Sequence, residues 1–255
     1  MNFNQLIIAD DFGFNQSSDQ VMLDLCSLKK IDGVSVFPKY ISQDQIDSML
    51  DLRKNRGIKI GLHFNLTLDD DKNSLKSIKQ LLIQSLFRPL NKELIAREFD
   101  SQLKVFKDKF NCYPDFIDGH EHVHAFPVIS KIVCKKLHDI QYTGLVRYIG
   151  SRSKDVLIRS IKHGFFLKFI TLEILAFGQR KHLIKNNLRF NERFDGLLPS
   201  NSSGNLVKIL QGIYGSSSLQ STIIMCHPGI IGTGLKSNFF GSKDREIEKN
   251  FLNGR

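Results

Sequence analysis

Residues 5–11 read Gln5-Leu6-Ile7-Ile8-Ala9-Asp10-Asp11, a short apolar run that ends in two adjacent carboxylates. A short run rich in isoleucine or valine that stops at a polar residue is typical of a buried β-strand. The same pattern returns along the chain and predicts six strands, at Gln5–Ala9, Gly33–Phe37, Ile58–Leu66, Asp115–Asp118, Tyr142–Arg147 and Thr222–Cys226.

Amphipathic segments separate these apolar runs. In Ser17–Ile31, the residues Val21, Leu25 and Leu28 fall on one helical face. Asn91–Phe110 shows a similar apolar face and also predicts a helix. Alternation of strands and helices favours parallel strands joined by crossover helices. We therefore expect an α/β fold with outer helices. Because no repeat or Pro- or Gly-rich linker divides the chain, we expect a single domain over residues 1–255.

The overall composition is that of a folded protein without disulfides. Of 255 residues, 41% are hydrophobic and 24% are charged, which allows a sizeable buried core. The four cysteines are scattered and favour free thiols over a disulfide framework. The apolar run Leu6–Ala9 is short for a signal peptide, and no apolar stretch reaches about 18 residues. We expect a soluble, cytoplasmic protein.

Side chains able to do chemistry follow the predicted strands. Asp10 and Asp11 end the first strand, and His63 lies in the third. Three more polar residues come at or just after later strands: His120, Arg147 and His227. In a parallel α/β barrel the C-terminal ends of the strands share one face, where active sites are assembled. We therefore expect these residues to meet.

One carboxylate and two imidazoles can form a divalent-metal site with open positions for water and substrate. The pair Asp10-Asp11 then allows a division of labour, in which one carboxylate binds the metal and the other takes a proton from water. A histidine on the opposite side can protonate a leaving group.

Each of these features also has a plain structural interpretation. An Asp-Asp pair after a strand is often a turn or a helix N-cap, and a single histidine such as His63 is more often one with satisfied hydrogen bonds than a metal ligand. The stretch His120-Glu121-His122-Val123-His124 is more specific, because three histidines at every second position share one face of an extended strand. Their joint occurrence at strand ends favours a functional site.

Four blocks of the sequence resemble the YdjC-like carbohydrate deacetylases, a family that includes chitooligosaccharide and hopanoid-associated deacetylases. These blocks appear in the family's order along most of the chain, at residues 9–13 (Ala-Asp-Asp-Phe-Gly), 61–67 (Gly-Leu-His-Phe-Asn-Leu-Thr), 118–127 (Asp-Gly-His-Glu-His-Val-His-Ala-Phe-Pro) and 225–229 (Met-Cys-His-Pro-Gly). Residues 151–221 match the family poorly, so loops that shape the substrate site are expected to be peculiar to this chain.

The resemblance implies a distorted (β/α) barrel related to the polysaccharide deacetylases, and it implies a role for each site residue. Asp11, His63 and His120 are implied as ligands of one divalent metal, magnesium or zinc. Asp10 is implied as the catalytic base and His227 as the acid. Arg147, His122 and His124 are implied near the substrate, with His124 also a candidate for orienting a ligand.

The implied reaction is hydrolysis of the N-acetyl group of an acetamido sugar, in an oligosaccharide or a glycolipid. A metal-dependent phosphoesterase or amidohydrolase on a related barrel is an alternative, although those sites usually begin with His-x-His where this chain has Asp-Asp. A nucleic-acid-binding protein is a second alternative because the net charge is +10. However, the chain has no zinc-finger spacing, RNP-like block or Gly-rich phosphate loop, so we expect no specific nucleic-acid partner. A pseudoenzyme is a third alternative, which nothing in the sequence requires.

The segment Ser151–Arg193 concentrates the positive charge. It holds ten Lys or Arg and three Asp or Glu, so +7 of the net +10 lies there, together with Phe165, Phe166, Phe169 and Phe177. We expect a helical insertion or an elaborated barrel helix. Packing against the core with solvated basic ends is the favoured interpretation. The alternative is an interfacial helix that touches a membrane and serves a lipid-linked substrate. The sequence leaves the assembly state open, a homodimer included.

Overall fold

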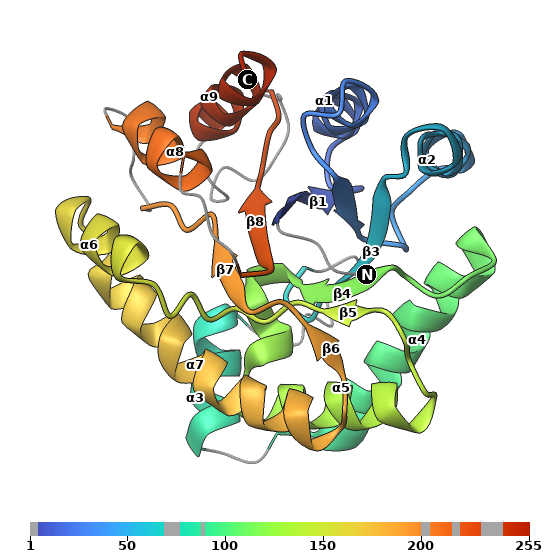
Figure 1. The fold of residues 1–255 in the computed structure, drawn as a ribbon. Coiled ribbons are helices and arrows are strands. Elements are labelled where there is room, and N and C mark those ends of the chain that lie inside the picture. Colours follow the sequence, from blue (N-terminus) through green and yellow to red (C-terminus); the bar gives the residue numbers. More distant parts are fainter. Residues whose placement is uncertain (1–4, 69–76, 88–89, 200–204, 216–219, 231–241) are drawn as a thin grey trace.

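Eight parallel strands make up one sheet at the centre of the structure, a computed structural model that describes residues 5–68, 77–87, 90–199, 205–215, 220–230 and 242–255. The strands are β1 (Gln5–Phe12), β2 (Gly33–Val36), β3 (Lys59–Phe64), β4 (Phe116–Gly119), β5 (Leu145–Val146), β6 (Arg189–Phe190), β7 (Arg193–Asp195) and β8 (Thr222–Cys226). Their order in the sheet is β6-β5-β4-β3-β2-β1-β8-β7. The sheet curves into a half-barrel, as predicted (Figure 1).

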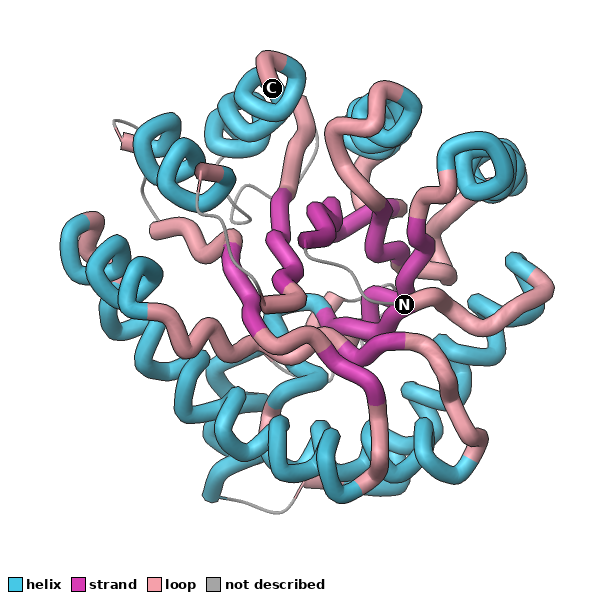
Figure 2. The backbone as a smooth tube through the Cα atoms, viewed as in Figure 1, coloured by secondary structure: helices cyan, strands magenta, loops and turns pink. Residues whose placement is uncertain are grey.

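Helices surround the outside of this sheet (Figure 2). They are α1 (Gln16–Ser27), α2 (Gln43–Arg56), α3 (Ile78–Phe87), α4 (Lys92–Phe110), α5 (Pro127–Asp139), α6 (Lys154–Lys162), α7 (Phe166–Lys185), α8 (Leu206–Tyr214) and α9 (Ser242–Asn253), with a 3-10 segment η1 (His120–Ala125) after β4. The core lies between the strands and these helices and is built mainly from Ile, Leu, Val and Phe. All four cysteines are free thiols, as predicted.

The ends of the predicted helices have identifiable causes. In α2, Ser42 and Gln45 form a reciprocal capping box, and Gly57 ends the helix in the left-handed conformation at φ 74°. Asn91 caps α4 by accepting a hydrogen bond from the backbone nitrogen of Leu94, and Phe99 and Phe106 on its inner face are fully buried. The helical pattern read from the sequence therefore gives both the bounds and the buried face of α4.

One extra residue in β1 places two carboxylates at the same end of the sheet. Ala9 pairs with Val34 and Phe12 pairs with Val36, so residues 10 and 11 of β1 stand opposite residue 35 of β2 alone. Such a β-bulge interrupts the alternation of side chains between the two faces of a strand. Asp11 adopts φ 67°, a left-handed conformation that Asp tolerates better than most residues. The side chains of Asp10 and Asp11 can therefore both lie at the same end of the sheet, although the two residues are consecutive.

A buried side chain helps to connect β7 to the segment that follows β5. Among the described residues, no strand pairing connects β6 to β7. Asn191, which is fully buried between them, accepts a hydrogen bond from the backbone nitrogen of Tyr148 (2.8 Å). Its Nδ2 donates to the carbonyl oxygens of Tyr148 and Arg193, both at 2.8 Å. These side-chain bonds add to the backbone hydrogen bond that Phe194 of β7 donates to the carbonyl oxygen of Gly150, at 3.0 Å.

Two expectations about local structure are wrong. The histidine-rich stretch after β4 is not an extended strand, because Glu121 and His122 take left-handed conformations, at φ 51° and 60°, and the chain turns into η1. The segment 151–193 is not wholly helical: after α6 and α7 it enters β6 and β7, which the sequence did not indicate. The rest of this segment is mainly helical and consists of α6, a short connection and α7.

Candidate active site

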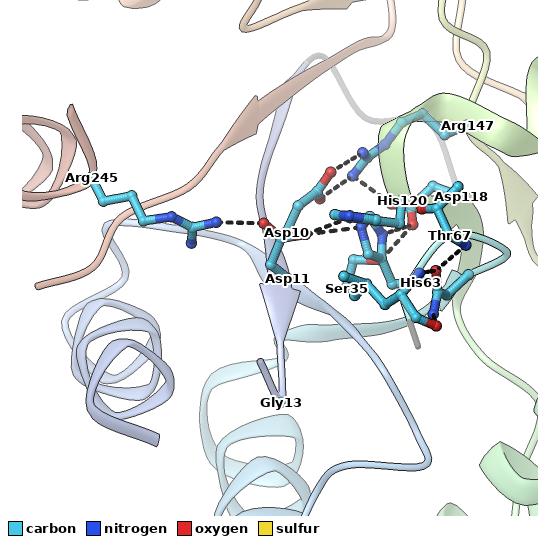
Figure 3. Close-up of polar contacts among 12 residues, drawn as sticks. Asp10, Asp11, Gly13, Ser35, His63, Thr67, Asp118, His120, Arg147 and Arg245 are labelled. Carbon is cyan, nitrogen blue, oxygen red and sulfur yellow. Dashed lines mark hydrogen bonds and ion pairs between the residues drawn. The ribbon is translucent and has the colours of Figure 1, made fainter. Parts of the chain in front are cut away.

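Three side chains from separate strand ends meet around one carboxylate oxygen (Figure 3). Asp11 Oδ1 lies 3.3 Å from His63 Nε2 and 2.9 Å from His120 Nδ1. The ligand atoms of Asp11, His63 and His120 all lie within 4.8 Å of one another, and the three residues are buried. The convergence expected from strand-end placement is therefore present.

His63 is held in place by a buried carboxylate on the neighbouring strand. The parallel register sets His63 beside Asp118, whose Oδ1 lies 2.6 Å from His63 Nδ1. Ser35, the residue opposite the β1 bulge, donates to the same Asp118 oxygen at 2.5 Å. Burial lowers the pKa of His63, but the carboxylates of Asp118, Asp11 and Asp10 outweigh it and raise the pKa to about 10. A cation that binds Nε2 therefore has to displace a proton.

Arg147 binds the carboxylate of Asp10, which also lies close to His63: the ligand atoms of Asp10, His63 and Asp118 all lie within 4.8 Å of one another. The two Arg147 amino groups lie 2.5 Å from Asp10 Oδ2 and 2.7 Å from Asp10 Oδ1, and Arg147 Nη2 also lies 2.6 Å from Asp118 Oδ2. Both Asp10 and Arg147 are almost completely buried. Burial raises the pKa of Asp10 above its ordinary value, although Arg147 opposes the shift. The result is an oriented carboxylate with increased basicity.

His227 follows β8 and is 7% exposed. Burial is the main cause that lowers its pKa, to about 3, with Asp11 opposing the shift and Arg245 adding to it. The imidazole is therefore neutral at pH 7.

Two residues of α9 complete the site and were missed in the sequence. Arg245 Nη2 lies 2.5 Å from Asp11 Oδ2, on the side away from the histidines (Figure 3). Glu248 accepts a hydrogen bond from the backbone nitrogen of His227 at 2.5 Å. Burial raises the pKa of Glu248 to about 7. Charged residues on a polar C-terminal helix usually face solvent, so no sequence signal distinguished these two.

Comparisons with known proteins show the family of this chain. The sequence profile of the YdjC-like protein family matches residues 5–255. The chain belongs to this family. It is 26% identical to a carbohydrate deacetylase of Xenopus laevis, over 88% of this chain and 80% of the relative. It is 28% identical to a chitooligosaccharide deacetylase of Enterobacter sp. (strain 638), over 51% of this chain and only 54% of that relative.

A solved structure shares the fold of this YdjC-like protein. It comes from Enterococcus faecalis V583 and was described as a candidate for cellobiose-phosphate cleavage. The TM-score is 0.62 at 19% identity, over 99% of this chain and 91% of that one. At this identity the likeness concerns the fold alone.

In this YdjC-like protein, the two later histidines of η1 occupy different surroundings from His120. His124 is buried, and its Nε2 lies 2.9 Å from the carbonyl oxygen of Arg147. Burial lowers the pKa of His124 to about 4. His122 meets the ring of Phe194 edge-on, with centroids 5.4 Å apart. His124 therefore supports the backbone at Arg147, and the substrate contacts expected for Arg147, His122 and His124 stay predictions.

The donor set fits a divalent cation. One carboxylate and two imidazoles are ligands typical of zinc and related ions, and Asp118 supplies the carboxylate partner that commonly orients a ligating histidine. Once the His63 proton is displaced, the surrounding charges also favour a cation, because the three buried carboxylates of Asp10, Asp11 and Asp118 then face only the two guanidinium groups of Arg147 and Arg245. The donor set alone does not choose between magnesium and zinc.

Proposed function

We propose that this protein is a metal-dependent hydrolase that removes the N-acetyl group from an acetamido sugar. The observation that carries the proposal is the convergence of Asp11, His63 and His120 beside the oriented carboxylate of Asp10. Relatives named carbohydrate deacetylase and chitooligosaccharide deacetylase support the substrate class.

Asp11, His63 and His120 would hold the single cation. When bound, a divalent cation supplies a Lewis acid that polarises the acetamide oxygen and lowers the pKa of water. The protein's contribution is to fix these three ligands on separate strand ends. Asp118 and Ser35 orient His63, and Arg245 holds the second oxygen of Asp11.

Asp10 would act as the general base that takes a proton from the attacking water. A base works best when its pKa approaches the working pH, and burial raises the pKa of Asp10 in that direction. Arg147 occupies both carboxylate oxygens, yet each oxygen keeps a second lone pair for the incoming proton.

His227 would deliver a proton to the departing nitrogen. Burial keeps the pKa of His227 low, so the ring is neutral before the reaction. Negative charge that develops on the substrate oxygen favours protonation of a nearby imidazole. In the balanced reaction, a bond forms between the water oxygen and the acetyl carbon and the carbon–nitrogen bond breaks. The proton that the water gives up to Asp10 balances the proton that the nitrogen gains through His227. The products are acetate and a free amine.

The test is an assay of acetate release from acetylated amino sugars, oligosaccharides and glycolipids, with magnesium, with zinc and after chelation. We expect metal-dependent acetate release that Asp10→Asn abolishes while the variant still binds metal. Release of phosphate from sugar phosphates, with no acetate from any acetylated substrate, would contradict the proposal and favour a phosphoesterase.

A further inference from the structure

The outer face of α7 carries several strongly exposed apolar side chains, whereas the outer face of α4 is charged. Leu167, Ile174 and Phe177 are 80%, 65% and 67% exposed. They lie seven and three residues apart, so they share one side of the helix. By contrast, α4 presents charged residues such as Lys92 and Arg97 at its exposed positions. Since the opposite face of α7 is buried in the core, the helix is apolar on both sides.

The neighbouring helix α6 also exposes apolar side chains. Ile158 and Ile161 of α6 are 62% and 61% exposed. α6 packs against α7, and only residues 163–165 connect the two helices (Figure 1). We name the five side chains the α6–α7 patch: Ile158, Ile161, Leu167, Ile174 and Phe177. A concentration of exposed apolar side chains on a soluble fold marks a contact surface.

Lysines border the patch. Lys162 of α6 and Lys185 of α7 are exposed, as is Lys181, whose Nζ lies 4.3 Å from the centroid of the Phe177 ring. Of the two acidic residues of α6 and α7, Glu173 is turned inward and accepts a hydrogen bond from the backbone nitrogen of Ser151, whereas Asp155 of α6 is exposed and is outnumbered by the three lysines. The patch is therefore apolar at its centre and basic at its edge.

The helix that carries the patch also contacts the candidate active site. On its buried side, Gln179 donates from Nε2 to the carbonyl oxygen of Arg147 at 2.8 Å. Near its start, Lys168 donates to the carbonyl oxygen of Leu198, and α7 packs against η1, which carries His120. The patch is therefore on a helix whose other face supports the site.

We propose that the α6–α7 patch docks the protein onto an anionic membrane surface, with α7 lying in the plane of the interface. Apolar and aromatic side chains with flanking lysines are what an interfacial helix requires, because the former enter the headgroup boundary and the latter attract anionic lipids. No helix in the described part of the chain is long and apolar enough to cross a membrane.

The chemistry of the patch argues against two other binding partners, a second copy of the chain and a nucleic acid. A second copy of the chain would bring an equally basic edge against this one, and like charges repel. A nucleic acid would match the lysines but would leave Leu167, Ile174 and Phe177 without an apolar partner. An anionic bilayer satisfies both the apolar centre and the basic edge.

The test is flotation of the full chain with phosphatidylcholine vesicles that contain or lack phosphatidylglycerol. We expect binding to the anionic vesicles at low salt, and loss of that binding at high salt because the lysine contribution is screened. The double variant Lys181→Gln/Lys185→Gln should bind at least about tenfold more weakly. Lys92→Gln/Arg97→Gln on α4 removes the same charge elsewhere and should bind like the wild type.

A second pair of variants tests the apolar centre. Leu167→Asn/Phe177→Asn should lose most binding at low salt, whereas Ile83→Asn, which changes a 52% exposed residue of α3, should not. Circular dichroism confirms that each variant is folded. Equal binding to neutral and anionic vesicles, or wild-type binding by the apolar variant, would overturn the proposal. So would failure to bind together with a dimer that the apolar variant dissociates, which would make the patch a protein interface. These measurements involve no turnover, so their failure leaves the proposed deacetylase reaction untouched.

Discussion

Arg147 binds both oxygens of Asp10, with nitrogen–oxygen distances of 2.5 and 2.7 Å, and both residues are buried. A two-point contact of this kind fixes the plane of the carboxylate as well as its position. The same guanidinium reaches Asp118, which in turn holds His63. One arginine therefore links the proposed base to the proposed ligand set.

Arg147→Lys is expected to uncouple these two parts. Lysine keeps the positive charge but cannot form the paired contact, so Asp10 loses its fixed orientation. We expect kcat to fall about 100-fold with a smaller change in KM, and the acidic limb of the pH–rate profile to move. Steady-state kinetics across pH measures this effect. A variant with an unchanged profile would show that Arg147 does not act through Asp10.

The adjacent aspartates are expected to respond differently to the same substitution. Asp10→Asn should retain metal and lose about 100- to 10,000-fold in kcat, because it removes a general base. Asp11→Asn should lose metal affinity, because it removes a charged ligand. Metal content after dialysis, measured beside acetate release, separates the two results. Equal metal loss in both variants would contradict the division of labour.

Asp118→Asn tests the support of His63. Loss of the carboxylate partner of a ligating histidine typically lowers metal affinity about 10- to 100-fold. We expect that decrease in a calorimetric titration with zinc, whereas His63→Ala should lose measurable affinity. Full affinity in His63→Ala would remove His63 from the ligand set.

Glu248 should make stability depend on pH. Burial raises its pKa from the ordinary value of 4.5 to about 7, so the folded protein holds a proton that the unfolded chain has released. Its contribution to the free energy of unfolding is thus complete below pH 4.5 and is lost as the pH rises through 7.

The variant Glu248→Gln removes this titration and keeps an oxygen for the backbone nitrogen of His227. Relative to the wild type, it should gain stability on the order of 3 kcal/mol between pH 4.5 and 8. Urea denaturation at several pH values measures the difference. A difference that stays constant with pH would show that Glu248 does not titrate in this range.

The sequence predicted the part of the site that depends on parallel strands. Asp10, Asp11, His63 and His227 lie at or near strand ends, and strands of one direction bring such residues together whatever their separation along the chain. The apolar runs that predicted β1, β3, β4 and β8 are long enough to be recognised. The roles of these residues, the single domain, the cellular compartment and the assembly state stay predictions.

Other features had no signal at the level of single residues. β6 and β7 have only two and three residues, too few to show a period. The left-handed turn at Glu121 and His122 lacks the Gly or Asn that usually marks one. Arg245 and Glu248 are buried because α9 packs beside the site, which depends on the complete fold.

The bulge in β1 gives the site an unusual kind of rigidity. Because Asp10 and Asp11 are consecutive residues, one planar trans peptide fixes their Cα atoms about 3.8 Å apart and so limits the separation of their carboxylates. Backbone covalent geometry therefore limits the spacing between Asp10, the proposed proton acceptor, and the cation bound by Asp11. The positions of the histidine ligands depend instead on the register of neighbouring strands. When heat or denaturant partly unfolds such a barrel, we expect the imidazole ligands to lose their positions first and the two adjacent aspartates to separate last.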